Sequence, residues 1–431
     1  NITQKEIIMP FNQASFWLRL MIITVITGLV SGSYPALFLS SFNPVKVLKG
    51  TLKLDSGTVW FRKGLVVFQF VLSSVLIIAT IVVSRQVNFI QSRNLGYDKE
   101  NLVYIHIEGE LEKKYNVFKN EAITLPGIQS VSVISSNPTN IDNSTISVSW
   151  EGKDPNVTIP FPNIAVGYDF IHTMKLKMLA GRDFSKDFPT DSDNFIINQV
   201  TQQKLGYANP IGRTITMWGR TGKIIGLVKD FHFQSLHKQI LPLIIRIAKG
   251  NMTGGDILVR TQPGKTKDAL AGLQALCKAL NPEFPFTFKF SDQQYQRLYK
   301  SEEIVGRLSN IFAFLAIFIS CLGLFGLAIF TAEQRIKEIG IRKVLGASVV
   351  SLFNLLSAEF LLLVIIAMVI ATPIAWYSMT AWLQGFAYRT TMQWWMFALS
   401  GGIIILIAVV TISFQTIKAA LVNPVKSLRS E

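Results

Sequence analysis

A group of ionisable residues in the middle of the chain has the composition of a metal site. Asp230, His232 and His237 lie close together in sequence, and carboxylate and imidazole groups are common ligands of zinc. Two histidines five positions apart, however, share no face of a helix and lie on opposite faces of a strand. This spacing favours a turn with surface histidines over a metal site.

Two other segments match chemical motifs only in part. Gly264-Lys265-Thr266 has the ending of a phosphate-binding loop, but the first glycine of that motif would fall at Val259. Asp183 and Asp187 could act as paired acids, yet they lie in a Gly-Arg-Asp-Phe-Ser stretch that is typical of a turn. No Ser-His-Asp arrangement stands out. We therefore expect no catalytic residue, no metal and no cofactor, and the chain itself is not expected to be an enzyme.

The strongest local signal lies in a charged segment between two apolar runs, residues 331–350. Its charged residues and glycines alternate with isoleucines, as in a short amphipathic helix with a hinge. The residues concerned are Arg335, Lys337, Glu338, Gly340, Arg342, Lys343 and Gly346. We expect this segment to lie at a membrane surface with a polar side open to a partner protein. The same periodicity also fits an interfacial helix without a partner.

A second motif occurs twice, as Asn-Pro-Val-Lys. Its residues are Asn43, Pro44 and Lys46 near the start of the chain and Asn423, Pro424 and Lys426 near the end. Proline cannot continue a helix, and the lysines suit anionic headgroups at a cytoplasmic surface. Each motif follows an apolar segment of equal length, so a duplicated helix bundle is one interpretation. A shared stop signal without common ancestry is the other.

The elements that carry these motifs are long apolar segments. The chain is 49% hydrophobic and only 16% charged, which is more apolar than a typical soluble protein. Segments long enough to cross a bilayer as helices lie at 17–39, 64–84, 308–330, 357–379 and 396–417. The sequence therefore predicts a membrane protein with an α-helical transmembrane bundle of about five helices.

Lysine and arginine predict the orientation of these spans. The loop after the first span carries Lys46, Lys49, Lys53, Arg62 and Lys63 against the single acid Asp55, so we expect it to be cytoplasmic. Residues 331–350 and the C-terminus then lie in the cytoplasm, and residues 85–305 lie outside. Flanking charges of this kind explain the net charge of +15 without nucleic-acid binding. Glu359 lies near a cytoplasmic end, which argues against an ion-coupled carrier.

Residues 85–305 are predicted to form a large α+β domain inserted between two spans. Strand-like runs occur at 102–107, 130–134, 145–150, 223–228, 243–247, 256–261 and 286–290. Leucines recur at helical spacing over 266–280, and Asn281-Pro282 ends that helix.

Several motifs taken together resemble the FtsX/MacB/LolC superfamily of ABC permeases. They are the 331–350 segment, the paired Asn-Pro-Val-Lys motifs, Gly181-Arg182-Asp183-Phe184-Ser185, Asn209-Pro210-Ile211-Gly212 and Gly226-Leu227-Val228-Lys229-Asp230-Phe231. The resemblance covers most of residues 16–431. It implies the C-terminal portion of an eight-span permease without a fused ATPase, in the bacterial cytoplasmic (inner) membrane, with a cytoplasmic C-terminus.

The resemblance also implies a division of the chain into parts. Residues 1–16 would be an outer loop, and 17–63 the last span of a first bundle with a cytoplasmic linker. Residues 64–84 would be the second span, and 85–305 a MacB-like extracytoplasmic domain. Residues 306–431 would be an FtsX-like permease domain with the coupling loop 331–350 and a cytoplasmic tail.

The function that this resemblance implies is a permease subunit for export or mechanotransmission. It would couple ATP hydrolysis by a separate ATP-binding cassette subunit to movement of the outer domain. Expected partners are that subunit, the lipid bilayer, a second permease bundle and a periplasmic or outer-membrane protein, but no nucleic acid. The alternative is a membrane-anchored scaffold or sensor whose outer domain binds a partner. Co-purification of an ATPase subunit distinguishes the two.

Overall fold

The computed structural model describes residues 13–40, 56–250, 254–335, 338, 341–342 and 345–421. They fall into two compact units. The helical unit contains the described residues up to 82 together with 304–379 and 392–421, and the sheet unit contains 83–303 and 380–391. The two motifs at Asn43, Pro44 and Lys46 and at Asn423, Pro424 and Lys426 lie outside the described residues.

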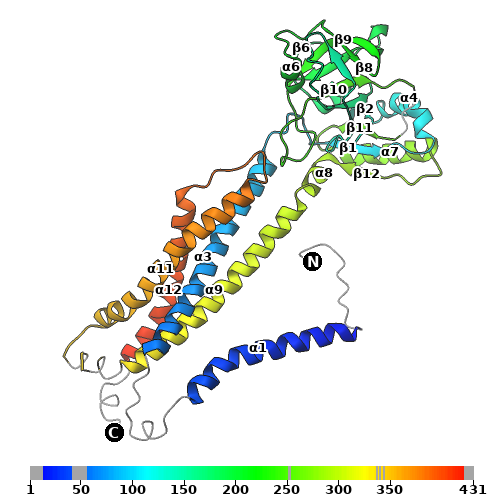
Figure 1. Ribbon diagram of the computed structural model, residues 1–431. Coiled ribbons are helices and arrows are strands. Elements are labelled where there is room, and N and C mark those ends of the chain that lie inside the picture. The colour runs from blue at the N-terminus through cyan, green and yellow to red at the C-terminus, as the bar shows by residue number, and fades with distance from the viewer. Residues whose placement is uncertain are drawn as a thin grey trace. The chain divides into compact units, whose positions relative to one another are not determined.

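The helical unit is built from long apolar helices (Figure 1). They are α1 (Ala14–Ser40), α3 (Ser56–Ser92), α9 (Lys300–Gln334), α11 (Val349–Leu383) and α12 (Trp394–Leu421). Within the described residues, the stretches that are long and apolar enough to cross a membrane are Ala14–Ser33, Trp60–Ser92, Lys300–Thr331, Ser357–Leu383 and Trp394–Ser413. The predicted set of about five membrane helices is confirmed.

Helices α3, α9, α11 and α12 pack along a shared apolar core in which small residues let the backbones approach. Ala367, Ala371 and Ala408 are fully buried there. The hydroxyl groups of Ser73 on α3 and Ser320 on α9 are 3.0 Å apart and hydrogen-bonded to each other. A polar pair buried between helices fixes their register, because each hydroxyl would otherwise lack a partner in apolar surroundings.

The sheet unit is built on one mixed β-sheet. Its strands are β1 (Leu102–His106), β2 (Ile128–Ile134), β3 (Ser144–Thr145), β4 (Val148–Trp150), β5 (Phe161–Val166), β6 (Met178–Gly181), β7 (Phe195–Asn198), β8 (Thr214–Met217), β9 (Arg220–Val228), β10 (Ile244–Ile247), β11 (Asp256–Thr261) and β12 (Phe288–Phe290). Their order is β12-β1-β11-β2-β5-β10-β7-β9-β8-β4, with β3 on β5 and β6 on β9. The pairs β5–β10 and β7–β9 are parallel.

Short helices connect and cover these strands. They are α4 (Leu111–Ala122), α5 (Phe170–Met174), a 3₁₀ turn (Pro189–Ser192), α6 (Gln199–Leu205), α7 (Thr266–Leu280) and α8 (Ser291–Arg297). The helix predicted at 266–280 is confirmed as α7, which buries Ala269, Leu273 and Leu276 in one apolar cluster with α4 and strands β1, β2 and β11. The prediction of a large α+β domain between two spans is confirmed.

The predicted strand-like runs account for about half of the strands in the sheet. Strands β1, β2, β9, β10, β11 and β12 overlap predicted runs. The run 145–150 is two short strands, β3 and β4, with Ile146 and Ser147 between them. Strand β5 was not predicted, because it contains Pro162 and Asn163, residue types that argue against a strand. Burial of the whole of β5 between its neighbours outweighs this local preference. Strands β6, β7 and β8 were also not predicted.

Three of the sequence motifs meet at strand β9. Gly181 pairs with Gly226 between β6 and β9, and the amide of Gly212 donates to the carbonyl of Ile224 at 2.8 Å. Gly181 has φ +73°, and a Cβ atom there would lie 2.1 Å from the Ile225 carbonyl oxygen. Only glycine fits this close backbone approach.

Candidate coupling site

The described part of the 331–350 segment contains four of the predicted site residues, namely Arg335, Glu338, Arg342 and Gly346. Lys337, Gly340 and Lys343 lie outside the described residues. The segment joins α9 to α11, so its charged residues are attached at both ends to long apolar helices.

Glu359 on α11 is the centre of a charge cluster in the helical unit. The guanidinium of Arg335, one residue beyond α9, donates to Glu359 Oε2 at 3.0 Å. The ammonium of Lys63 on α3 donates to Glu359 Oε1. One carboxylate therefore joins α3, the start of the 331–350 segment and α11. An acid in an otherwise apolar helix needs such partners, because an unpaired charge there would be costly.

A second contact joins α3 to the end of α9. The guanidinium of Arg62 lies 4.5 Å from the centre of the Phe330 ring, which is a favourable cation–π geometry. Arg62 and Lys63 are adjacent, so neighbouring residues of α3 hold both the end of α9 and Glu359.

The residues near 340 present a charged turn with apolar side chains exposed beside it. Arg342 Nη2 and Glu338 Oε1 form an ion pair of 2.8 Å at helical spacing. Ile341 is 53% exposed and Leu345 is 80% exposed. The Ala347 amide donates to the Arg342 carbonyl at 2.9 Å, across Gly346 at φ +87°. This is the Schellman arrangement that ends a helix with a left-handed glycine.

Asp230, His232 and His237 lie in separate surroundings within the sheet unit. Asp230 Oδ1 accepts from the Val200 amide at 3.0 Å at the start of α6. Burial lowers the pKa of His232 to about 4, and the nearby Arg93 adds to the shift. His237 Nε2 lies 2.9 Å from Glu302 Oε1. Within the part of the chain that the structure describes, no three such residues come together as a metal site would require.

Asp183 and Asp187 each make a local hydrogen bond in the turn after β6. Asp183 Oδ1 accepts from the Phe184 amide at 2.7 Å, and Asp187 Oδ2 accepts from the Ser185 hydroxyl at 2.8 Å. The adjacent Arg182 forms a two-pronged ion pair with the buried Asp191, at 2.5 and 2.8 Å. These bonds fix the turn after β6.

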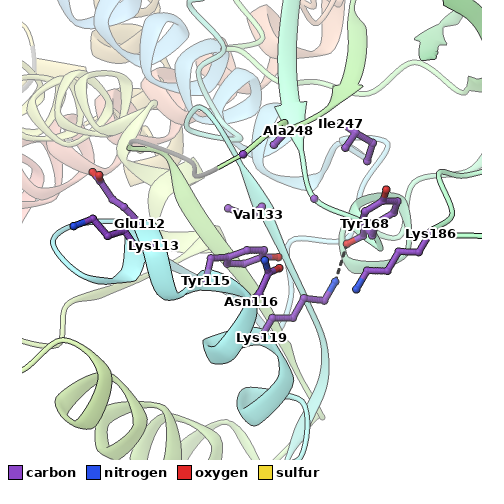
Figure 2. Close-up of a pocket in the computed structure, with 12 residues that line it drawn as sticks. Glu112, Lys113, Tyr115, Asn116, Lys119, Val133, Tyr168, Lys186, Ile247 and Ala248 are labelled. Carbon is purple, nitrogen blue, oxygen red and sulfur yellow. Dashed lines mark hydrogen bonds between the residues drawn. The ribbon is translucent and has the colours of Figure 1, made fainter. Parts of the chain in front are cut away.

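A pocket of about 300 Å³ lies in the sheet unit between α4 and the strands β2 and β10. Figure 2 shows Lys119 extending from α4 towards Tyr168. Its ammonium donates to the Tyr168 carbonyl at 3.1 Å and pairs with Asp169 at 2.7 Å, so this charge is already neutralised. Burial raises the pKa of the Tyr115 phenol and keeps it neutral. The other lysines that line the pocket, Lys113 and Lys186, are exposed, so the pocket has no enclosed reactive group.

Two family models match the chain. Residues 70–274 match the MacB-like periplasmic core domain, and residues 310–424 match the FtsX-like permease C-terminal domain. The chain is a MacB/FtsX-like permease. As such it is a multi-pass inner-membrane protein whose sheet unit is a large periplasmic domain. The suspected resemblance to this superfamily is confirmed.

Characterised relatives cover part of the permease. It is 22% identical to the macrolide export ATP-binding/permease protein MacB of Aggregatibacter actinomycetemcomitans over 210 residues, which are 47% of the permease and 33% of that relative. It is 26% identical over 191 residues to the MacB of Neisseria gonorrhoeae, covering 42% of the permease and 30% of the relative. The permease thus spans about a third of the length of these relatives.

Solved structures of periplasmic or extracellular domains are also similar to the permease. The periplasmic region of MacB from Actinobacillus actinomycetemcomitans has a TM-score of 0.35 and 18% identity, covering 48% of the permease and 97% of that structure. The extracellular domain of the noncanonic ABC-type transporter YknZ from Gram-positive bacteria has a TM-score of 0.33 and 16% identity, covering 44% and 98%.

The pairing of Lys63 with Glu359 was not predicted from the sequence. In the sequence, Lys63 is one of the charges that orient the spans, and Glu359 is an acid near the end of a span. The useful signal was present: a lone acid in a long apolar helix of the permease requires a cation from another element. The sequence could not show which cation, because Lys63 lies 296 positions away.

Proposed function

We propose that this chain is a permease subunit that couples ATP hydrolysis by a separate ATP-binding cassette subunit to movement of the periplasmic domain. The 331–350 segment would contact that subunit. The C-terminus of the chain would lie in the cytoplasm. The complex would act in export or in mechanotransmission. The permease family supports this role.

The observation that carries the proposal is the Glu359 cluster. Arg335 lies at the start of the 331–350 segment, and its ion pair reaches α11 while Lys63 connects the same carboxylate to α3. Displacement of the segment would therefore pull on α3 and α11 as well as on α9. A charge cluster that joins three helices suits a part that transmits force.

Helix α3 can carry such a displacement because it is one continuous helix from Ser56 to Ser92. Its first part belongs to the helical unit, and residues from 83 onward belong to the sheet unit. Helix α9 likewise begins in the sheet unit and continues to Gln334. Unbroken backbone hydrogen bonding makes a helix stiff along its axis, so both helices would act as rods.

The exposed side chains of Ile341 and Leu345 would enter an apolar groove of the ATP-binding subunit. Such side chains, displayed on a short helix, are a common way for a helix to dock into a partner. The ion pair between Glu338 and Arg342 would stabilise this short helix. It would leave the side chain of Leu345 exposed for the contact.

Site-specific photo-crosslinking tests the proposal. A photoreactive residue at Leu345 of the full-length protein, co-expressed with its candidate ATP-binding subunit, should crosslink to that subunit. The same residue at Ile146, exposed in the sheet unit, should not. Leu345→Glu should also reduce the ATPase activity of the purified complex by roughly tenfold, as loss of a central apolar contact would. Normal activity with Leu345→Glu, or the absence of any bound ATPase subunit, would favour the scaffold or sensor alternative.

A further inference from the structure

The loop between α11 and α12 is held tightly by the sheet unit. Gln86 on α3 uses both ends of its amide: Nε2 donates to the Tyr388 carbonyl at 2.9 Å, and Oε1 accepts from the Thr390 amide at 2.9 Å. The amide of Ala387 donates to the His237 carbonyl at 3.2 Å. Phe386 is buried in the main core of the sheet unit. Residues 380–391 are therefore an integral part of this unit and are attached at defined points.

His237 contacts both the loop and α9. Its Nδ1 lies 3.0 Å from the Gly385 carbonyl oxygen, and its Nε2 lies 2.9 Å from Glu302 Oε1. The imidazole also stacks on the Phe386 ring with centroids 4.1 Å apart. Glu302 Oε2 accepts separately from the Ser301 hydroxyl at 2.8 Å.

The contacts of His237 with Gly385 and Glu302 require two hydrogens. A neutral histidine beside a carboxylate has only one. A carbonyl oxygen can only accept, so Nδ1 must carry a hydrogen. The bond between Nε2 and Glu302 then needs a second hydrogen, either on the imidazole or on the carboxyl group. Without it, the Nε2 lone pair would face the carboxylate oxygen and the contact would be repulsive.

We propose that the His237–Glu302 pair is a pH-dependent latch that fastens residues 380–391 to the periplasmic domain. With the extra proton bound, the imidazole joins the Gly385 carbonyl to Glu302 and the loop is fastened. Loss of the proton at higher pH breaks the bond to Glu302, so the imidazole is no longer held to α9, and the loop that it contacts through Gly385 and Phe386 loosens with it. Histidine is the side chain whose proton exchange falls in the physiological range, and a periplasmic domain is exposed to the pH outside the inner membrane.

Other ionisable groups lie near the His237–Glu302 pair. On the elements around His237 they are Arg93, His232, Lys238, Tyr295, Tyr299, Lys300, Glu303, Tyr388 and Arg389. Glu303 Oε1 accepts from Gln91 at 2.8 Å. Arg93 lies 4.3 Å from the centre of the Tyr388 ring, and the Tyr299 hydroxyl accepts from the Leu236 amide at 2.6 Å. With its pKa lowered to about 4, His232 stays neutral between pH 5 and 8. A change in the loop over that range thus points to His237 and Glu302.

Hydrogen–deuterium exchange of the full-length protein in nanodiscs tests the latch. After correction for intrinsic rates, amides of residues 385–390 should exchange roughly tenfold faster at pH 8 than at pH 5.5, since a charge-assisted hydrogen bond is lost. His237→Gln should remove this pH dependence. As a matched control, His106→Gln removes another histidine–acid pair, with Asp256 at 3.1 Å, and should leave it intact. Exchange independent of pH, or an unchanged dependence in His237→Gln, would overturn the latch.

A second measurement covers the case in which His237→Gln does not fold. The ring ¹⁵N shifts of His237 in the unmodified protein, labelled at histidine, report the proton directly. We expect both ring nitrogens to be protonated at pH 5.5, or one to be strongly hydrogen-bonded to a protonated Glu302, with a change by pH 8. A neutral ring whose shifts stay constant from pH 5.5 to 8 rejects the latch, whatever the exchange of the loop.

Discussion

Arg335 and Glu359 are 24 positions apart and joined by an ion pair of 3.0 Å, which attaches the beginning of the 331–350 segment to α11. Lys63 on α3 shares the same carboxylate. The pair lies at one end of apolar helices, where the two side chains are about one third exposed, at 35% and 29%. It can therefore stabilise the bundle more than a fully hydrated pair would, though less than a buried one.

Replacing the shared carboxylate should destabilise the helical unit. For Glu359→Gln we expect a loss of about 1–2 kcal/mol in the free energy of unfolding, because two cations lose their acceptor in a partly apolar setting. Reversible unfolding of the full chain in mixed micelles measures this. Glu338→Gln is the matched control, since it removes only an exposed helical pair and should cost about 0.5 kcal/mol or less. Equal losses in the two variants would contradict a special role for Glu359.

Gly181 should tolerate no side chain, because β6 and β9 touch there. Gly181→Ala places a Cβ atom 2.1 Å from the Ile225 carbonyl oxygen, and we expect a cost of about 2–4 kcal/mol from the clash and the positive φ together. Gly152→Ala is the control: its φ is +85° with nothing within 4 Å, so only about 1 kcal/mol should be lost. Thermal unfolding of the full chain compares them, and similar melting temperatures would mean that the contact is unimportant.

Asp183 should make stability depend on pH. Burial raises the pKa of its carboxyl group to about 6, from an ordinary value of 3.8. The folded state therefore holds this proton more tightly than the unfolded state, and stability falls as the pH rises from about 4 to about 6. Asp183→Asn should stabilise the protein at pH 7.5 by about 1–3 kcal/mol and change little at pH 4. Unfolding at both pH values measures the difference, and a gain of equal size at pH 4 would contradict it.

The proposed topology predicts opposite labelling of two exposed positions. Ile146 in the sheet unit is 60% exposed and Leu345 is 80% exposed. A membrane-impermeant maleimide added to intact inner-membrane spheroplasts should label Ile146→Cys and not Leu345→Cys. Permeabilisation should then expose Leu345→Cys. The natural Cys277 is buried and Cys321 lies within α9, so background labelling should be low. Labelling of both variants in intact spheroplasts would refute the proposed orientation.

The sequence by itself determined the parts of this protein that depend on local patterns. Uninterrupted apolar runs are long enough to cross a bilayer only as helices, so the membrane helices could be predicted from length and composition. Helix α7 could be predicted from leucines at helical spacing. Strands β1 and β11 could be predicted from runs rich in β-branched residues. The turns at Gly181 and Gly212 could be recognised as motifs, but not the strand at which they meet.

Only the tertiary structure decided which distant residues meet. Glu359 could have paired with any of many basic residues, and packing of α3 against α11 selected Lys63. Strand β5 forms despite Pro162 because its neighbours bury it, and residues 380–391 join the sheet unit through Gln86 and His237 rather than remaining a simple loop. Such contacts depend on long-range packing, which no local period of hydrophobicity records.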